Sequence, residues 1–314
     1  MEIIKGLENL NKGYPHTVLT IGNFDGVHLG HQKILFEVIK KAQVINGTSM
    51  ALTFDPHPMK ILAPDRELRI LTPFDEKAKL IEDLGIDVLL CIQFNRAFAN
   101  LLPDEFIEDV LVKKIHAEEI VVGSNYVFGK NKKGTIELLR RRGKKHGFRV
   151  KVMRHARINS DIVSSSKIRS LLSKGAVFNV STFLGRAYSI EGTVIKGKGR
   201  GREILSIPTA NITTPVEIAP KEGVYTVRIG FNNSVYDGVA NIGRNPTFGN
   251  AEVSYEVHLF NFSSDILGKT IRIYFIDRIR DERRFPDPSS LAQQILKDIE
   301  TARKILKTKH PKLI

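Results

Sequence analysis

The feature that most constrains the fold is a change in hydrophobic patterning near residues 178–187. Before this point, short apolar runs typical of buried strands alternate with segments of helical periodicity. The expected strands are 17–21, 50–54, 88–94, 119–122 and 148–152, and the expected helices are 32–43, 74–84, 104–115 and 135–145. Strands that alternate with helices form βαβ units, so the first half is predicted to be an α/β domain with a mostly parallel sheet.

After this point, strand-like segments follow one another without intervening helices, and Gly, Asn and Pro separate them. These segments are 189–195, 224–229, 235–240, 253–260 and 270–275. The pattern favours an antiparallel barrel or sandwich. Apolar residues then recur every three or four positions and predict a terminal helix, with Leu291, Ile295, Ile299, Ala302 and Ile305 on one face. We therefore predict two domains, residues 1–182 and 183–314.

The composition excludes several classes of protein. The single cysteine, Cys91, rules out an intrachain disulfide and any multi-cysteine zinc site. The sequence contains no run of 18 or more apolar residues, so we expect no transmembrane helix. The first residues, Met-Glu-Ile-Ile-Lys, lack the pattern of a secretory leader, so we expect a cytoplasmic protein that does not associate with membranes.

The net charge of +14 indicates an anionic partner, either a polynucleotide, a membrane surface or small molecules. Much of the charge is clustered in residues 130–133, 140–145, 196–202 and 304–312. Aromatic residues do not interleave with these clusters and Trp is absent, whereas single-strand binders supply aromatic stacking platforms. We therefore favour small anionic ligands over nucleic acid, and we interpret residues 140–145 as a solvated helix face.

A glycine-rich turn that runs from Gly22 to His31 follows the first long apolar run. Its glycines would let the backbone approach a ligand closely, and the helix that begins near His31 would direct free N–H groups at an anion. His28 and His31 are three residues apart and could contact the same phosphate. The glycine spacing matches neither the dinucleotide fingerprint nor a P-loop. The alternatives are incidental surface histidines or zinc ligands, although no further ligand stands at a suitable spacing.

A second anion-binding pattern lies at residues 163–169, which read Val-Ser-Ser-Ser-Lys-Ile-Arg. Three hydroxyls stand at an expected helix start, with Lys167 and Arg169 just inside the helix. The alternative interpretation is a simple serine N-cap.

Together these two patterns resemble the His-x-Gly-His and Ile-Ser-Ser-Thr-x-x-Arg motifs of nucleotidyltransferases. Residues 54–58, Phe-Asp-Pro-His-Pro, and 122–129, Val-Gly-Ser-Asn-Tyr-Val-Phe-Gly, are similar to the FAD synthetase branch, the bacterial bifunctional riboflavin kinase/FMN adenylyltransferases. Ser166 stands where many members have Thr. The resemblance implies a Rossmann-like nucleotidyltransferase domain that converts ATP and FMN into FAD and pyrophosphate, with Mg²⁺ bridging the phosphates.

The resemblance also implies roles for individual residues. His28, His31 and Arg169 would be catalytic. The residues expected to bind ATP are Gly22, Asn23, Phe24, Asp25, Gly30, Ser164, Ser165 and Ser166. The residues expected on the FMN side are Asp55, His57 and Asn125.

The second half opens with a basic, glycine-rich segment between Gly192 and Asn211. Backbone N–H groups of such a segment suit phosphate binding, although a flexible charged hairpin is the alternative. The stretch 208–211, Pro-Thr-Ala-Asn, supplies a hydroxyl and an amide oxygen, which are ligands suited to magnesium.

Residues 223–225, 238–243, 245–247 and 256–262 follow at the spacing of riboflavin kinases, and the terminal helix is similar as well. The resemblance implies a six-stranded barrel that phosphorylates riboflavin. Glu256 would be the general base, and Thr209 and Asn211 would bind magnesium. The glycines implied at the kinase phosphates are Gly197, Gly199 and Gly201.

One departure from the kinase pattern keeps alternatives open. Residues 205–207 read Leu-Ser-Ile where family members usually have a Gly-Phe pair before Pro-Thr-Ala-Asn, and Ile266-Leu-Gly268 replaces the usual Leu-Tyr-Gly. The alternatives are a monofunctional FMN adenylyltransferase with an inactive kinase-like domain, a regulatory flavin- or RNA-binding protein, and a nucleotidyltransferase for another phosphorylated acceptor. We expect a monomer or weak self-association.

Overall fold

The computed structural model describes residues 1–196, 209–245 and 252–313. The packing divides the chain into two units, Met1–Val163 and Ser164–Ile314. Residues 164–182 therefore group with the second unit, and the sequence-based boundary between 182 and 183 stays a prediction.

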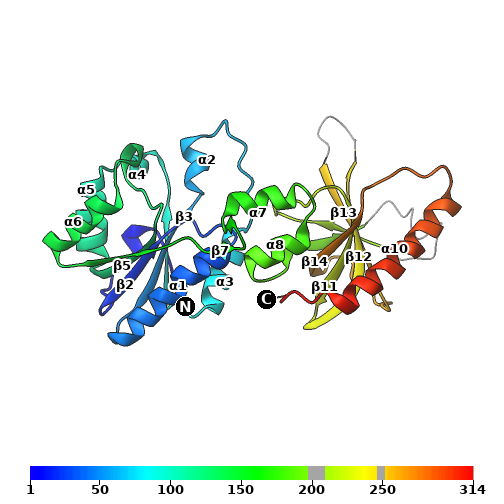
Figure 1. The fold of residues 1–314 in the computed structure, drawn as a ribbon, viewed down its shortest axis with the longest axis horizontal. Coiled ribbons are helices and arrows are strands. Elements are labelled where there is room, and N and C mark those ends of the chain that lie inside the picture. The colour runs from blue at the N-terminus through cyan, green and yellow to red at the C-terminus, as the bar shows by residue number, and fades with distance from the viewer. Residues whose placement is uncertain (197–208, 246–251, 314) are drawn as a thin grey trace. The chain divides into compact units, whose positions relative to one another are not determined.

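A six-stranded sheet forms the centre of the first unit (Figure 1). Every pair of neighbouring strands is parallel, which confirms the predicted α/β class. The strand order is β1-β4-β3-β2-β5-β6. The strands are β1 (Glu2–Lys5), β2 (Thr17–Ile21), β3 (Ser49–Asp55), β4 (Val88–Gln93), β5 (Ala117–Gly123) and β6 (Arg149–Met153). The sequence pattern missed β1, a four-residue edge strand with one buried side chain.

Helices cover both faces of this sheet. Because successive strand residues point to opposite sides, neighbouring residues of one strand pack against different helices. Val18 of β2 packs with α1 (Leu29–Val44) and α3 (Phe74–Asp83) on one face. Leu19 packs on the other face with the π-helix η2 (Phe106–Lys114), which continues α5 (Pro103–Glu105), and with α6 (Ile136–His146). Burial of each such aliphatic side chain contributes about 1.5–3 kcal/mol.

Short elements complete the first unit. They are η1 (Leu7–Asn9), α2 (Pro58–Leu62), α4 (Arg96–Ala99), η3 (Lys130–Lys132), β7 (Arg157–Ile158) and β8 (Asp161–Ile162). Helix α6 begins where the Thr135 hydroxyl caps the Leu138 N–H and ends at Gly147, whose φ is 84°. Four of its basic residues are exposed, which confirms the predicted solvated face: Arg140, Arg141, Lys144 and Lys145.

The strands that follow β2 in the sequence are added first on one side of β2 and then on its other side. From β2 the strands run outward through β3 to β4, whereas β5 and β6 lie on the other side of β2. Open α/β sheets bind ligands at such a switch point, beyond the carboxyl ends of the strands. The loops that follow β3, β2 and β5 are therefore where a ligand site is expected.

The second unit contains a closed antiparallel barrel of six strands, ordered β10-β13-β12-β11-β14-β9, as predicted. The strands are β9 (Tyr188–Ile195), β10 (Ala210–Thr213), β11 (Gly223–Phe231), β12 (Ser234–Asn245), β13 (Glu252–Leu259) and β14 (Thr270–Arg280). The helices within the described part of this unit are α7 (Ser165–Leu172), α8 (Val177–Leu184) and α10 (Pro288–Thr308). The sequence pattern missed β10, which is short and mostly polar.

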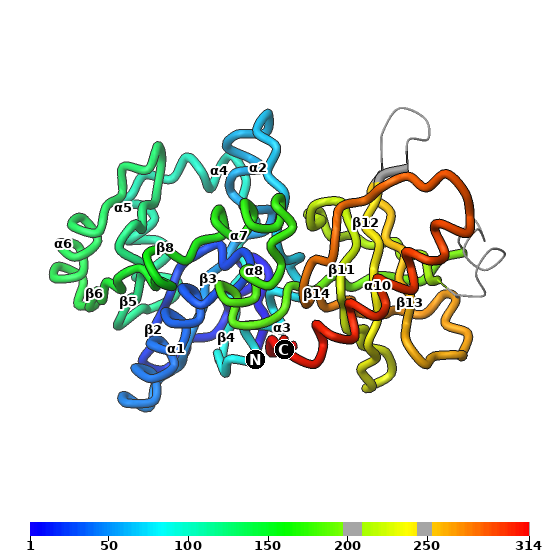
Figure 2. The backbone as a smooth tube through the Cα atoms, turned by 45° about the vertical axis from the view of Figure 1, so that its right-hand side comes forward, coloured from blue at the N-terminus to red at the C-terminus, as the bar shows by residue number. Residues whose placement is uncertain are grey.

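The predicted terminal helix is α10, which lies against the outer surface of the barrel (Figure 2). Ala302 and Leu306 of α10 are buried together with Val239 of β12 and Ile276 of β14. The Asp287 side chain accepts a hydrogen bond from the Ser290 N–H and so caps the first turn.

Candidate functional site

Three of the segments singled out in the sequence follow neighbouring parallel strands. The glycine-rich turn follows β2, residues 55–58 follow β3, and residues 123–129 follow β5. The order β3-β2-β5 brings the carboxyl ends of these strands side by side at the switch point. The predicted ATP turn and both predicted flavin segments therefore share one edge of one sheet.

The turn after β2 has an unusual backbone. Phe24, Gly26 and Val27 have φ values of 50°, 87° and 38°. A positive φ is rare for a β-branched residue such as Val27, and residues held in this region cost about 1–3 kcal/mol each. Such strain persists only where surrounding contacts fix the backbone, and it is concentrated at functional sites.

Side chains from other segments hold this turn. The Asp25 carboxylate accepts hydrogen bonds from the backbone N–H groups of Leu71 (3.0 Å) and Thr72 (3.2 Å). The Gln32 amide donates to the Val27 carbonyl (2.8 Å). Asp25 and Phe24 are almost fully buried. Both were predicted as ATP-binding residues, and in the structure they shape the turn from its inner side.

His28 and His31 form a stacked pair at the start of α1. Their ring centroids lie 3.6 Å apart with 15° between the planes. His28 is the N-cap, and its Nδ1 accepts a hydrogen bond from the His31 N–H at 3.3 Å. An Nδ1 that accepts a hydrogen bond leaves the proton on Nε2, so a neutral His28 has a donor on the opposite edge of its ring.

Burial, reinforced by the neighbouring His28 and by Lys77, holds the pKa of His31 well below its usual value. The His31 Nδ1 is buried without a hydrogen-bond partner among the described residues. Burial without a partner disfavours the charged ring, because an unsatisfied buried cation is costly. His31 is therefore a neutral imidazole near pH 7.

A side chain at either of two glycines of the turn would press on a neighbouring ring. A Cβ at Gly30 would lie 3.1 Å from Cε1 and Nδ1 of His28 and 3.6 Å from the Val163 carbonyl oxygen. A Cβ at Gly22 would lie 3.1 Å from the Phe24 ring. The glycines thus leave room for the His28 ring and for the inward turn of Phe24.

The segments after β3 and β5 carry the residues predicted on the FMN side. Asp55 and Asn125 are exposed. The His57 Nδ1 caps α2 by accepting from the Met59 N–H at 3.1 Å. The Asn125 amide oxygen lies 3.2 Å from the position that a Cβ would take at Gly123. These side chains follow strands on either side of β2.

A continuous series of aromatic rings connects the same two segments. Neighbouring centroids lie 5.5–6.0 Å apart along the series Phe54, Phe94, Phe98, Phe106, Phe128 and Tyr126. Phe54 belongs to β3, and Phe128 and Tyr126 follow β5. Phe94, Phe106 and Phe128 are buried, so this series packs the interior of the unit between the two segments.

Lys77 of α3 is a residue of this region that the sequence analysis missed. Only 7% of it is exposed, and its Nζ donates to the Asn23 carbonyl (3.3 Å) and the Thr53 hydroxyl (3.2 Å). The available signal was its position on the buried face of α3, beside Ala78 and one turn before Ile81. A lysine on such a face is uncommon unless its charge has a partner.

The serine motif begins α7 in the second unit. The Ser164 hydroxyl caps this helix by accepting from the Lys167 N–H at 3.2 Å, so the serine N-cap interpretation is confirmed for Ser164. Ser165 and Arg169 are half-buried, and Ser166 is exposed. Val163, the residue before this motif, is buried in the first unit near Gly30.

Three polar residues of the kinase-like half lie in one row across the barrel. Glu256 of β13 pairs with Asn211 of β10 and with Asn241 of β12. Their strand neighbours Ile212, Tyr255 and Ala240 are buried in the barrel interior, so the three polar side chains point outward. Sequence analysis missed Asn241, although it lies in the Gly238–Gly243 stretch. Thr209 is exposed just before β10, and Gly197, Gly199, Gly201 and residues 205–207 lie outside the described residues.

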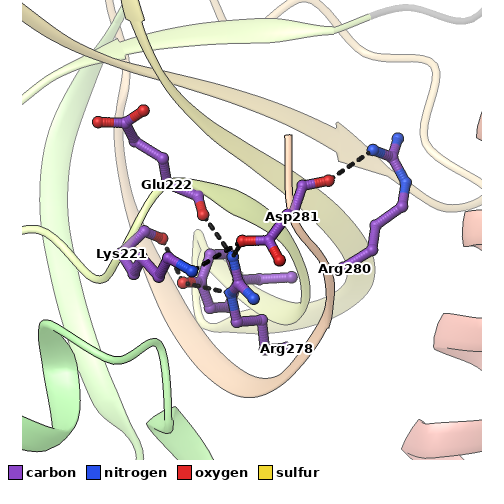
Figure 3. A network of polar contacts seen from close by, with 6 residues as sticks. Lys221, Glu222, Arg278, Arg280 and Asp281 are labelled. Carbon is purple, nitrogen blue, oxygen red and sulfur yellow. Dashed lines mark hydrogen bonds and ion pairs between the residues drawn. The ribbon is translucent and has the colours of Figure 1, made fainter. Parts of the chain in front are cut away.

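A network centred on Arg278 ties the end of β14 to the segment before β11 (Figure 3). Arg278 donates to the Asp281 carboxylate (2.7 Å), the Glu222 carbonyl (2.6 Å) and the Tyr225 hydroxyl (3.3 Å). Lys221 also pairs with Asp281 at 2.8 Å. Hydrogen bonds from Arg278 and Lys221 lower the pKa of Asp281 to about 2.

Both halves of the chain match known protein families. The family described as FAD synthetase matches residues 11–167, and the family described as riboflavin kinase matches residues 184–306. The chain belongs to the bifunctional riboflavin kinase/FMN adenylyltransferase family. A relative with that name from Buchnera aphidicola subsp. Acyrthosiphon pisum is 37% identical over 95% of this chain and 96% of its own length.

Other relatives with the same name support this assignment. The Escherichia coli K12 protein is 34% identical and covers 96% of this chain and 97% of its own length. The Bacillus subtilis protein is 38% identical and covers 91% of each chain. The family assignment predicted from the motifs of both halves is thus confirmed.

A solved structure from Streptococcus pneumoniae shares the fold with a TM-score of 0.89. It is 30% identical and covers 96% of this chain and 99% of its own chain. That protein is described as a macrolide-efflux protein, a function that matches neither family found in this chain. Among the described residues, no helix is long and apolar enough to cross a membrane.

Proposed function

We propose that this chain phosphorylates riboflavin to FMN in its barrel unit and adenylylates FMN to FAD in its parallel-sheet unit, with ATP as the donor in both reactions. The observation that carries this proposal is the convergence of the His28–His31 turn, residues 55–58 and residues 123–129 at the switch point of one sheet. The membership of both halves in flavin-enzyme families supports it.

In the adenylyl transfer, a phosphate oxygen of FMN attacks the α-phosphorus of ATP, and pyrophosphate leaves. Both reactants are anions, so positioning and stabilisation of charge carry most of the catalysis, and no protein nucleophile is required. The His28 Nε2–H and the free N–H groups at the start of α1 would donate to the α-phosphate oxygens. His31 would act as a neutral donor beside it.

The remaining ATP contacts are assigned from the motifs. The backbone between Gly22 and Gly30 would follow the nucleotide, including Asn23. Ser165, Ser166 and Arg169 would hold the β- and γ-phosphates, together with the Ser164 hydroxyl, which can donate while it caps α7. On the acceptor side, Asp55, His57 and Asn125 would bind polar atoms of FMN.

In the barrel unit, Glu256 would accept the proton of the ribityl hydroxyl as that oxygen attacks the γ-phosphorus of ATP, and ADP leaves as the bond between the γ-phosphorus and the β-phosphate oxygen breaks. The strand register supports this assignment, because it places Asn211 and Asn241 directly beside Glu256. Amide, hydroxyl and carboxylate oxygens fit Mg²⁺, so Asn211 and Thr209 would hold the ion. When bound, Mg²⁺ would neutralise charge on the nucleotide phosphates.

The glycines Gly197, Gly199 and Gly201 would contribute backbone N–H groups to the kinase phosphates. The partners are then small molecules rather than nucleic acid. Because both reactions consume ATP, we place the enzyme in the cytoplasm, as a monomer or a weakly associating chain.

The deciding experiment is chromatography of flavins after the full chain has been incubated with ATP, Mg²⁺ and either riboflavin or FMN. We expect FMN and then FAD from riboflavin, and FAD from FMN. FAD from FMN with riboflavin left unchanged would show a monofunctional adenylyltransferase, and no turnover of either flavin would refute the proposal.

A paired substitution assigns the two reactions to the two units. The His28→Ala/His31→Ala variant should lose FAD formation and still convert riboflavin into FMN. If this variant makes FAD at the wild-type rate, the assignment of the adenylyl-transfer site is wrong.

A further inference from the structure

The amino group of Lys77 is buried beneath Asn23, the second residue of the turn that runs from Gly22 to His31. Lys77 Nζ lies 3.3 Å from the Asn23 carbonyl oxygen and 3.2 Å from the Thr53 Oγ1, and the Thr53 hydroxyl itself donates to the Asn23 carbonyl at 3.3 Å. Asn23 precedes Phe24, where φ first becomes positive. The three groups therefore fix the backbone at the point where the chain leaves the sheet and enters the turn.

The contacts connect elements that are distant in sequence. Lys77 comes from α3, Thr53 from β3 and Asn23 from the turn after β2, so 54 and 24 positions separate Lys77 from its two partners. Thr53 is fully buried. A charge-assisted hydrogen bond is stronger than a neutral one, and a buried backbone carbonyl that loses its donors is penalised.

We propose that Lys77 is a positioning residue for adenylyl transfer, whose amino group holds the Asn23 carbonyl and thereby fixes the turn that presents His28 and His31 to ATP. This inference rests on the proposed adenylyl transfer and adds a residue of α3 to it. Lys77 would affect the reaction only by fixing the backbone of the turn.

The charge of Lys77 also acts on His31. After burial and the neighbouring His28, Lys77 is the third cause that lowers the pKa of the His31 ring. Burial lowers the pKa of Lys77 itself, whereas Cys91, Asp25 and Asp55 oppose that shift. Among the described residues, His28 and Lys77 are the titratable groups that shift the His31 pKa. Removal of the Lys77 charge should therefore raise the pKa of His31.

The test compares Lys77→Met with Lys79→Met in the full chain, because Lys79 lies on the exposed face of the same helix. FAD formation from FMN, ATP and Mg²⁺ is measured as kcat and KM between pH 5 and 9, and phosphorylation of riboflavin is measured in parallel. For Lys77→Met we expect kcat for FAD formation to fall by about 10- to 100-fold, the range for loss of a hydrogen bond to a charged group. The KM for FMN and the riboflavin kinase rate should stay unchanged, as should both activities of Lys79→Met.

The pH profile distinguishes positioning from simple support of the fold. If catalysis requires the neutral His31 ring, activity falls as the pH drops through the His31 pKa. Loss of the Lys77 charge raises that pKa, so the acidic limb of the Lys77→Met profile should move to higher pH. Lys77→Arg keeps the charge and should keep the wild-type limb.

A wild-type kcat and acidic limb in folded Lys77→Met would overturn the inference, and so would an equal fall of both activities in protein that remains folded. If Lys77→Met does not fold, Thr53→Val decides, since it removes only the hydroxyl between Lys77 and Asn23. A drop in kcat for FAD formation of about 3- to 10-fold supports the inference, and an unchanged kcat refutes it. Failure of the wild-type chain to make FAD would instead refute the proposed function.

Discussion

Replacement of Gly30 by Ala should separate catalysis from stability. A Cβ at position 30 would lie 3.1 Å from two atoms of the His28 ring, so the ring must move by a few tenths of an ångström. The His31 N–H to His28 Nδ1 hydrogen bond is already 3.3 Å long, and this movement would break it. Loss of such a cap costs about 1 kcal/mol.

The opposing effect on stability has a similar size. Gly30 is the second residue of α1, and an alanine is favoured over a glycine within a helix by about 0.8–1 kcal/mol. The φ of Gly30 is not among the positive values in this chain, so the backbone accepts an alanine. The free energy of unfolding should therefore change by less than about 1 kcal/mol.

The expected effect on FAD formation is large. Loss of one preorganised donor to a developing charge typically lowers kcat by about 10²–10³-fold, so a displaced His28 should lower it by about 100-fold. The assay follows FMN converted to FAD in Gly30→Ala, with thermal unfolding measured on the same sample. Gly13→Ala is the matched control, because no atom lies within 4 Å of its added Cβ. FAD formation at the wild-type rate in Gly30→Ala would refute the claim that Gly30 determines the position of His28.

Three further predictions concern the second unit. Glu256→Gln keeps the size of the side chain but removes the base, so riboflavin phosphorylation should fall by at least about 100-fold while FAD formation from FMN persists; an active kinase would exclude Glu256 as the general base. Gly175→Ala introduces a Cβ at a φ of 73° and 2.5 Å from the Arg278 side chain. It should lower the free energy of unfolding, measured by denaturant titration, by about 1–3 kcal/mol. Unchanged stability would show that the turn between α7 and α8 can shift. The pKa of Asp281 is lowered to about 2, so its stabilising contribution is present above the unfolded value of about 3.9 and is lost as the pH falls towards 2. Between about pH 4 and pH 2, the free energy of unfolding should therefore fall less steeply in Asp281→Asn than in the wild-type chain. Identical acid-unfolding curves for the two proteins would contradict the role of the Arg278 and Lys221 contacts.

The sequence by itself determined the two architectures and the place in the fold of the turn proposed to bind ATP. Periodicity distinguishes a helix from a strand because side chains repeat every 3.6 or 2 residues, so the alternating first half predicted a parallel sheet and the later strands predicted a barrel. The resemblance to bifunctional flavin enzymes specified the six strands of the barrel. The His28–His31 turn could also be placed from sequence, because it directly follows a buried strand and contains its own glycines.

The tertiary structure decided which residues of the motifs face inward and which distant residues support them. Phe24 and Asp25 are buried inside the turn, and their contact with ATP stays a prediction. Lys77 bonds to a carbonyl 54 positions away.

The row of three polar residues on the barrel also depends on the tertiary structure. Asn211 and Asn241 flank Glu256 only because the strand register of a closed barrel places them there. Periodicity along the chain specifies the face of an element, whereas the partner across that face depends on strand order, register and helix packing. For this protein, the sequence therefore singled out the histidine pair proposed to act on ATP, and the fold revealed the lysine that contacts the backbone of their turn.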